Sequence, residues 1–139
     1  MLMAIFGILD FSRALYTYHF VSYAAQEGAR YAMVRGGDWG TVSCSSYNSY
    51  DCQATAAEIQ SYVQSLAPPG IGASKIVATP SWPQETASGS STGCSTTGTQ
   101  ADQGCIVKVA VSYQFQFILP FLPNSGISMK ASSEQVISY

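Results

Sequence analysis

The apolar residues of this chain are concentrated at its start and then recur at helical spacing. Residues 1–9, MLMAIFGIL, are uncharged and almost wholly apolar, and the first charge is Asp10. Between Asp10 and Arg35 there is no proline, and residues that favour a helix are frequent. The pair Gly36–Gly37 supplies a stop signal after it. A helix over residues 1–35 would be about 50 Å long, so we expect part of it to project from a small domain.

The opening apolar run has a length that limits what it can be. A bilayer-spanning helix takes about 20 apolar residues, and this run is shorter. It also lacks the basic flank that precedes the apolar part of a secretory signal. We therefore interpret Met1–Leu9 as the end of a longer hydrophobic helix.

Downstream, the pattern predicts one more helix and a small sheet. Residues 53–67 place apolar side chains on one helical face and end at Pro68-Pro69-Gly70. Residues 74–82 are a strand candidate, residues 105–119 alternate strongly, and residues 126–139 form a last strand. One face of the central strand carries Val107, Val109, Val111, Tyr113, Phe115 and Phe117.

These elements predict an α+β fold. Strands joined by loops pair antiparallel, so we expect a long N-terminal helix plus a short helix packed on an antiparallel sheet of about three strands. We divide the chain into an assembly helix, residues 1–35, and a globular head, residues 36–139. The central strand should rest its Val/Tyr/Phe face on the helices.

The chain is poor in charge. Charged residues make up 10 % of its 139 residues, against about 25 % in soluble domains, and such a surface is expected to be hidden in a membrane or a polymer. The net charge of −2 and the scattered basic residues argue against a nucleic-acid partner.

Four cysteines predict two local disulfides. The spacings C-x7-C and C-x10-C are not those of a zinc site, and the chain has one histidine. Four cysteines allow three connectivities, and proximity favours Cys44–Cys52 and Cys94–Cys105. Disulfides place a protein outside the cytosol; the alternative is four free thiols.

The sequence offers little that could carry out chemistry. His19 is the single histidine, and we interpret it as a packing or interface residue rather than a general base, because no carboxylate or nucleophile accompanies it in a pocket-forming pattern. The acidic residues are dispersed, although loop aspartates leave a calcium site as an alternative. We expect no enzyme activity, no cofactor, no metal site and no small-molecule substrate.

Small residues recur on the long helix. Ala24, Gly28 and Ala32 follow one another at every fourth position, and Ala25 with Ala29 forms a second row. Such a stripe lets two helix backbones approach closely, so we predict a helix-packing interface with another subunit. The alternative is that the helix lies on its own sheet. On the first interpretation, a Gly28→Leu change blocks assembly and leaves the head folded.

Two charge pairs lie on the same helix at i,i+3 spacing. Asp10 precedes Arg13, and Glu27 precedes Arg30. An exposed pair of this kind contributes little, whereas burial in a filament would make pairing obligatory.

Residues 7–36, GILDFSRALYTYHFVSYAAQEGARYAMVRG, resemble the N-terminal segment of TadE-like pilus-assembly proteins of the tight-adherence system. The match rests on an apolar run followed by Asp10, Phe11, Ser12, Arg13 and Ala14, and on the block Ala24-Ala25-x-Glu27-Gly28-Ala29-Arg30-Tyr31-Ala32. The resemblance implies a pilin-like fold and a membrane-anchored precursor, trimmed by a prepilin peptidase. The given sequence differs from the family's precursors, because it shows neither their basic leader nor their longer hydrophobic stretch with an early glutamate.

Two functions follow as hypotheses. In the first, the chain is a structural pilin-like subunit that assembles through its N-terminal helix into, or at the base of, an extracellular filament. Its partners would be copies of itself or other pilin subunits, and the inner membrane before assembly. In the second, it is a membrane-anchored adhesin that binds a surface through loops 38–52 and 84–104.

Overall fold

The computed structural model describes most of the chain. The described residues are 2–39, 44, 52–83, 85, 86, 88, 89, 94, 103–118 and 126–138. Two α-helices, two short 3₁₀ helices and three strands follow one another in the order α1 (Leu2–Met33), η1 (Gly37–Trp39), α2 (Ala56–Ser65), η2 (Ala73–Lys75), β1 (Ile76–Ser81), β2 (Ile106–Phe115) and β3 (Ile127–Val136). The predicted α+β architecture is confirmed.

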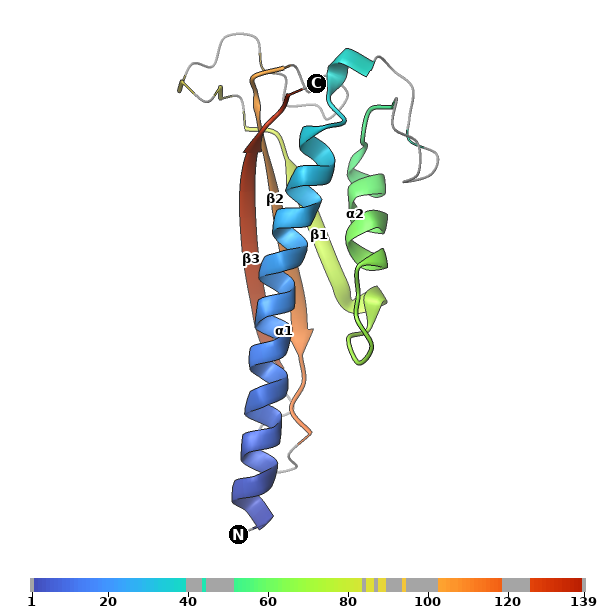
Figure 1. Ribbon diagram of the computed structural model, residues 1–139. Coiled ribbons are helices and arrows are strands. Elements are labelled where there is room, and N and C mark those ends of the chain that lie inside the picture. Colours follow the sequence, from blue (N-terminus) through green and yellow to red (C-terminus); the bar gives the residue numbers. More distant parts are fainter. Residues whose placement is uncertain are drawn as a thin grey trace.

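Helix α1 is continuous over 32 residues and is therefore about 48 Å long. It ends at Met33, two residues before the expected end at Arg35. The carbonyl of Met33 accepts the backbone N–H of Ser138 at 3.1 Å, so the end of the chain satisfies one of the free carbonyls of the helix. The first turns of α1 extend beyond the sheet, as expected from its length (Figure 1).

Helix α2 begins three residues later than the apolar pattern suggested, because Thr55 caps it. The Thr55 hydroxyl accepts the N–H of Glu58 at 3.4 Å, and the Glu58 carboxylate accepts the N–H of Thr55 at 2.7 Å. This reciprocal capping box fixes the first turn. The helix then ends at Ser65, ahead of Pro68.

The sheet has the order β1-β2-β3 with both pairs antiparallel. Val111 of β2 lies opposite Ala78 of β1 and Ala131 of β3. Along β2, buried and partly exposed residues alternate, as the sequence pattern predicted. Since β2 is central and buried on one face, this face forms the floor of the core.

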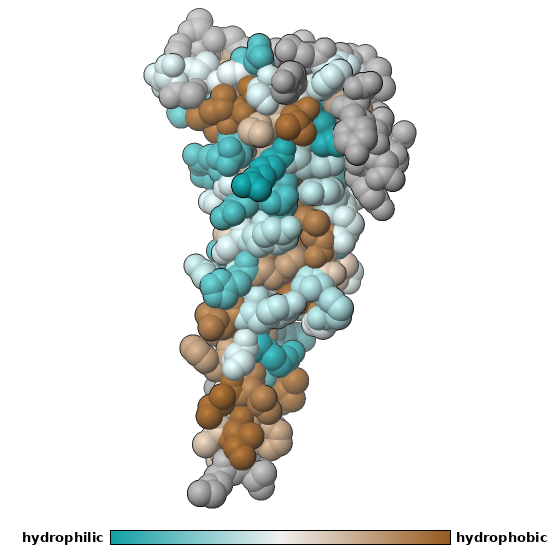
Figure 2. All heavy atoms as spheres, viewed as in Figure 1, coloured by the Kyte–Doolittle hydropathy of each residue, from teal (hydrophilic) through white to brown (hydrophobic). Residues whose placement is uncertain are grey.

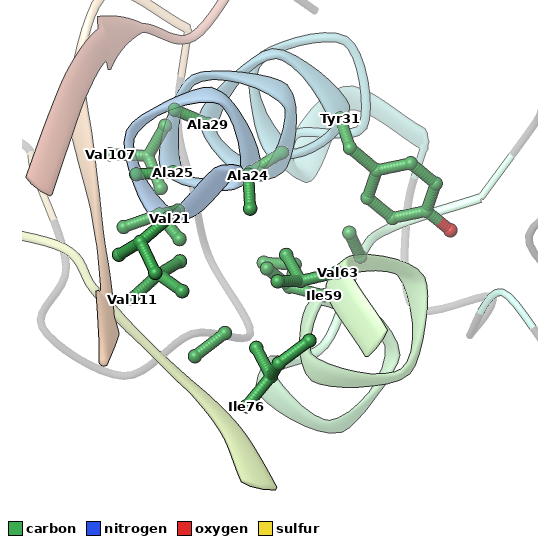
Figure 3. Close-up of a cluster of buried hydrophobic side chains, with 14 of the residues drawn as sticks. Val21, Ala24, Ala25, Ala29, Tyr31, Ile59, Val63, Ile76, Val107 and Val111 are labelled. Carbon is green, nitrogen blue, oxygen red and sulfur yellow. The ribbon is translucent and has the colours of Figure 1, made fainter. Parts of the chain in front are cut away.

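On this side of the sheet, the second half of α1 lies over β2 and β3, and α2 lies over β1 beside it (Figure 3). Val21 of α1, Ile59 and Val63 of α2, and Val107 and Val111 of β2 are almost fully buried. We divided the chain at residue 35 into an assembly helix and a head. Side-chain packing does not separate the two, since the second half of α1 belongs to the core of the head. The opposite face of the sheet carries no helix among the described residues.

Candidate functional site

The first half of α1 is an exposed apolar rod, which we call the stalk (residues 3–18). Met3, Ile8 and Phe11 are 67 %, 66 % and 70 % exposed. Further large apolar residues that are exposed here are Ile5, Phe6, Leu9, Leu15, Tyr16 and Tyr18. Figure 2 shows the apolar residues gathered at the narrow end of the molecule. The stalk thus exposes far more apolar surface than a solvated helix does.

These exposed side chains do not form one stripe. Successive helical residues are about 100° apart, so positions 3, 5, 6, 8, 9, 11, 15, 16 and 18 point to all sides of the stalk. A helix that is apolar all round is buried in a larger assembly or in lipid. The stalk therefore requires partners on more than one side.

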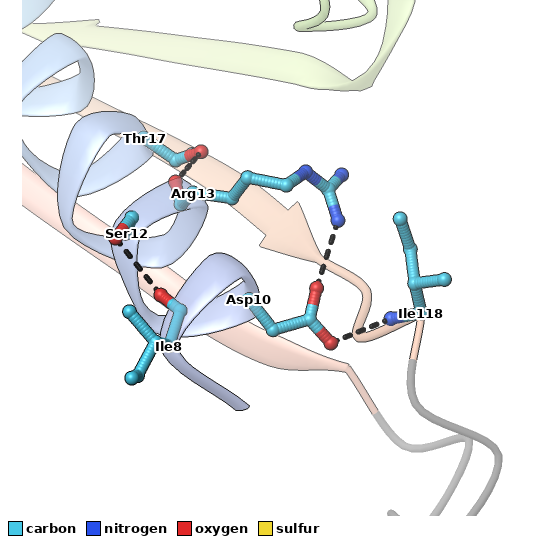
Figure 4. Close-up of polar contacts among 6 residues, drawn as sticks. All are labelled: Ile8, Asp10, Ser12, Arg13, Thr17 and Ile118. Atoms are coloured by element: carbon cyan, nitrogen blue, oxygen red, sulfur yellow. Dashed lines mark hydrogen bonds and ion pairs between the residues drawn. The ribbon is translucent and has the colours of Figure 1, made fainter. Parts of the chain in front are cut away.

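Within the stalk, a polar cluster ties the helix to the segment after β2, and we call it the neck (Asp10, Arg13 and Ile118). One carboxylate oxygen of Asp10 lies 3.0 Å from Nη1 of Arg13, and the other accepts the N–H of Ile118 at 3.1 Å (Figure 4). The predicted Asp10–Arg13 pair is confirmed. Asp10 is only 5 % exposed, so these partners compensate a nearly buried charge.

The neck also ties the segment after β2 to the helix. The Arg13 guanidinium lies 5.5 Å from the centre of the Phe115 ring, within reach of a cation–π contact. Beside it, an apolar groove of about 270 Å³ is lined by Phe6, Leu9 and the three neck residues. The sequence did not indicate Ile118, because its partner Asp10 lies 108 residues away.

The small-residue stripe has a different partner from the one we predicted. Ala24, Ala25, Ala29 and Ala32 are at most 4 % exposed and belong to the buried core cluster. Ala24, Ala25 and Ala29 face the chain's own sheet and α2 (Figure 3). A Cβ at Gly28 would lie 2.9 Å from Val63 and 3.1 Å from Val109. The expectation of an interface with another subunit is corrected: this face is already occupied, and the alternative of a helix lying on its own sheet holds.

The second charge pair is local and solvated. Nη1 of Arg30 lies 3.2 Å from Oε1 of Glu27, and the Arg30 side chain is 64 % exposed. The predicted pair is confirmed. At this exposure it contributes little to stability.

Tyr31 and Tyr62 form a stacked pair between α1 and α2 that the sequence analysis did not identify. Their ring centres are 4.3 Å apart, and the Arg35 guanidinium lies 4.0 Å from the centre of the Tyr31 ring. Burial raises the pKa of both tyrosines above 10.0; Arg35 opposes this rise in each of them. Both hydroxyls therefore stay neutral at physiological pH. The sequence feature that could have indicated this stacked pair is the presence of tyrosines on both helices.

Both predicted disulfides are confirmed. Cys44 pairs with Cys52 and Cys94 with Cys105, and all four cysteines are buried. Of loops 38–52 and 84–104, most residues lie outside the described ranges. Cys105 also forms an isolated bridge with Thr86, which joins the second disulfide to the sheet.

The described residues show no other chemical centre. His19 is exposed on α1, with its ring edge-on to Tyr18 at 6.2 Å. In the described part of the chain, histidine, cysteine and acidic residues nowhere gather in a group of three that could hold a metal ion. Across the same ranges, no helix combines the length and apolar character that a bilayer-spanning segment requires.

Residues 1–30 match the family model for TadE-like protein, which confirms the resemblance of the N-terminal segment. Searches of curated proteins and of solved structures gave no significant match. The matched segment comprises the stalk, with Asp10 and Arg13 of the neck, and most of the part of α1 that packs in the head.

Proposed function

We propose that this chain, whose N-terminal segment is TadE-like, is a structural, non-enzymatic subunit of a pilus-type filament. In this proposal the stalk is the assembly element, and the head is displayed around it. The single observation that carries the proposal is the stalk itself, whose exposed large apolar side chains point to all sides and whose first turns project from a folded head.

Burial of the stalk supplies the driving force. Each large apolar side chain that moves from water into an apolar environment contributes about 1.5–3 kcal/mol. Nine such side chains are exposed on the stalk: Met3, Ile5, Phe6, Ile8, Leu9, Phe11, Leu15, Tyr16 and Tyr18. Even partial burial against neighbouring stalks therefore favours association over a free monomer.

The neck fits the same role. An unpaired carboxylate in a bundle of apolar helices would be costly, but Asp10 is already compensated by Arg13 and by the N–H of Ile118. Neighbouring stalks can then approach the neck without supplying a countercharge. The apolar groove beside it can take a side chain of a neighbouring stalk.

We infer an extracytoplasmic location, with the stalk held by the inner membrane before assembly and by other pilin-type subunits afterwards. The two disulfides support an oxidising compartment. The rival hypothesis of an adhesin depends on loops 38–52 and 84–104. No described residue favours it over the structural role.

The test introduces a charge into the stalk without touching the head. Ile8→Asp and Phe11→Asp each place a carboxylate at a position that is exposed in the monomer, so the head should fold normally. We expect at least a tenfold loss of surface filaments, counted by electron microscopy, because a buried unpaired charge costs several kcal/mol.

The matched control is Gln26→Asp, at an exposed position on the head part of the same helix. It should assemble like the wild type. Wild-type filament numbers in the Ile8→Asp and Phe11→Asp variants would contradict the proposal. Secretion of the folded protein without filaments in the wild type would favour the adhesin.

A further inference from the structure

A polar cavity lies on one side of the stalk, next to the apolar groove of the neck. It has a volume of about 440 Å³ and is formed by α1, by the loop that leads from α2 to β1, and by the end of β2 with the residues that follow it. This volume lies within the range of small-ligand sites. Arg13 and Ile118 line both the polar cavity and the apolar groove, so the two meet at the neck.

The charged residues that line the polar cavity are both positive. Arg13 reaches it from the stalk and Lys75 from η2, and no carboxylate of the described residues lines it. Nζ of Lys75 lies 3.4 Å from Oε1 of Gln116. An arginine carries five N–H donors and a lysine three, and the contacts with Asp10 and Gln116 use one of each. Further donors are therefore available for an anion with several oxygen atoms.

The Asp10 carboxylate offsets only part of this positive charge. It lies 3.0 Å from Nη1 of Arg13 and lines the apolar groove, not the polar cavity. Lys75 forms no ion pair with a residue of the described ranges. The cavity and the groove together thus carry two positive charges and one negative charge. A ligand with one net negative charge would make the whole site neutral.

The groove and the cavity follow one another along the helix in the order of a lipid. Phe6 and Leu9 line the apolar groove and precede Arg13 in the chain. Tyr16 and Thr17 line the polar cavity and follow it. The groove is therefore nearer the apolar tip of the stalk, and the cavity is nearer the head (Figure 2). A phospholipid in a membrane has the same order of acyl chain and phosphate, whereas a free anion would leave the groove unfilled.

The position of Arg13 along the stalk suits the surface of a membrane. From Leu2 to Arg13 the helix rises about 16 Å, which is close to half of the roughly 30 Å hydrocarbon core of a bilayer. A stalk immersed up to Arg13 therefore has Leu2 near the middle of the bilayer. Tyr16 and Tyr18 are exposed just beyond this level, and tyrosine is enriched at membrane–water interfaces.

We propose that the polar cavity and the apolar groove form a binding site for one anionic phospholipid of the membrane that holds the subunit before assembly. The phosphate lies between Arg13 and Lys75, and an acyl chain lies in the groove against Phe6 and Leu9. A zwitterionic lipid is disfavoured, because its cationic group meets no carboxylate in the cavity. The proposal rests on the membrane-held stage of the proposed function and adds the class of lipid. On assembly, a side chain of a neighbouring stalk displaces the acyl chain from the groove.

Quenching by brominated lipids tests the site. Bromine on an acyl chain quenches tryptophan fluorescence at short range, so Phe6→Trp reports which lipid occupies the groove. The matched control is Ile8→Trp, at an exposed position that does not line the groove. Since successive residues are about 100° apart, position 8 lies about 160° from position 6 around the helix. The chain without an added tryptophan gives the background from Trp39 and Trp82.

The full chain is reconstituted into phosphatidylcholine vesicles that contain a small fraction of phosphatidylglycerol, with bromine on one of the two lipids at a time. For Phe6→Trp we expect phosphatidylglycerol to bind about fivefold more tightly than phosphatidylcholine, or better, because one basic side chain beside an anionic headgroup accounts for a factor of this size. For Ile8→Trp the two lipids should quench in proportion to their share of the bilayer.

Charge variants in the Phe6→Trp background test which residue gives the preference. Lys75→Gln should abolish it, because the charge of Arg13 that remains is offset by Asp10. Lys75 is exposed, so the head should fold normally. The control Lys130→Gln removes an exposed lysine of β3 that does not line the cavity, and it should keep the preference. Equal preferences in these two variants would overturn the proposal.

The two reporters separate this proposal from the filament proposal. If both are quenched and Phe6→Trp shows no preference for phosphatidylglycerol, the lipid site is wrong and the membrane-held stage stands. If neither is quenched by either lipid, the membrane-held stage fails and the lipid site fails with it. Inorganic phosphate, added at constant ionic strength, should leave the preference unchanged. Its loss under these conditions would assign the cavity to a free anion and refute the lipid site.

Discussion

Gly28 is the residue at which α1 approaches α2 and β2 closely. Its replacement tests whether the small-residue stripe packs within the chain or against another subunit. A Cβ at this position would lie 2.9 Å from Cγ2 of Val63 and 3.1 Å from Cγ1 of Val109. Carbon atoms in contact are normally about 3.5–4.0 Å apart. Both valines are fully buried, and β-branched side chains have few alternative rotamers, so neither can move away cheaply.

The expected loss of stability follows from these distances. For Gly28→Ala, helix propensity gains about 1 kcal/mol, and overpacking costs about 1–3 kcal/mol, so the net loss is at most about 2 kcal/mol. Gly28→Leu adds three more carbons in the same occupied direction. We expect the free energy of unfolding to fall by about 3 kcal/mol or more, which is a large part of the roughly 5–15 kcal/mol typical of a domain.

Urea unfolding of the full chain, followed by tryptophan fluorescence, measures this loss. With an m-value of about 1–3 kcal/mol per molar, Gly28→Leu should lower the midpoint by about 1–3 M. The control Gln26→Leu, two residues earlier on an exposed position, should change the free energy of unfolding by less than about 0.5 kcal/mol.

The opposite outcome would reverse our assignment. If Gly28→Leu unfolds at the wild-type midpoint but fails to form filaments, the stripe meets another subunit and not the chain's own core. A variant that is both destabilised and unassembled supports the intramolecular contact that the structure shows.

Three further predictions concern the neck, a disulfide and the tyrosine pair. Asp10→Asn removes the charge that accepts the N–H of Ile118, three residues after the end of β2. We expect hydrogen exchange of the Ile118 amide to speed up about tenfold, since hydrogen bonds to charged groups contribute about 1.5–3 kcal/mol; unchanged exchange would exclude a role for the neck. Replacing Cys94 and Cys105 by serine should lower the free energy of unfolding by about 3 kcal/mol, from the entropy of an 11-residue loop, and equal urea midpoints would argue against this. The pKa of Tyr62 is raised above 10.0 in the folded state, so the unfolded chain loses its proton first, and the free energy of unfolding should fall as the pH rises from 10 through the folded pKa. In Tyr62→Phe this fall should be smaller, because only Tyr31 remains; an unaltered pH profile would refute the assignment.

Local patterns predicted the elements well. Strict alternation along Val107–Phe115 identified β2 and its buried face, because one face of a half-buried strand must be apolar. The boundaries were less accurate where a single side chain decides them. Thr55 delays the start of α2 because its hydroxyl and the Glu58 carboxylate close a capping box, a signal that was present in the sequence as T-A-A-E.

The partners of the site residues could not be predicted in the same way. A stripe of small residues predicts that a neighbouring element packs closely against α1. It does not identify that neighbour as α2, the sheet or another subunit. Likewise, the i,i+3 spacing gave Arg13 as a partner of Asp10, while the N–H of Ile118 comes from a segment that only the tertiary fold brings near. Contacts over such separations depend on the whole topology.

The continuity of α1 has a mechanical consequence. The helix runs from the stalk into the core without a break, so a pulling force on the stalk reaches the head along the helix axis. The force first meets the neck, and then acts parallel to the interface that α1 forms with β2 and β3. Its contacts are loaded together, in shear, rather than opened one after another. Resistance to such a force is governed by the rate of unfolding, and a head that shares one continuous helix with its stalk therefore tolerates tension that a hinged head would not.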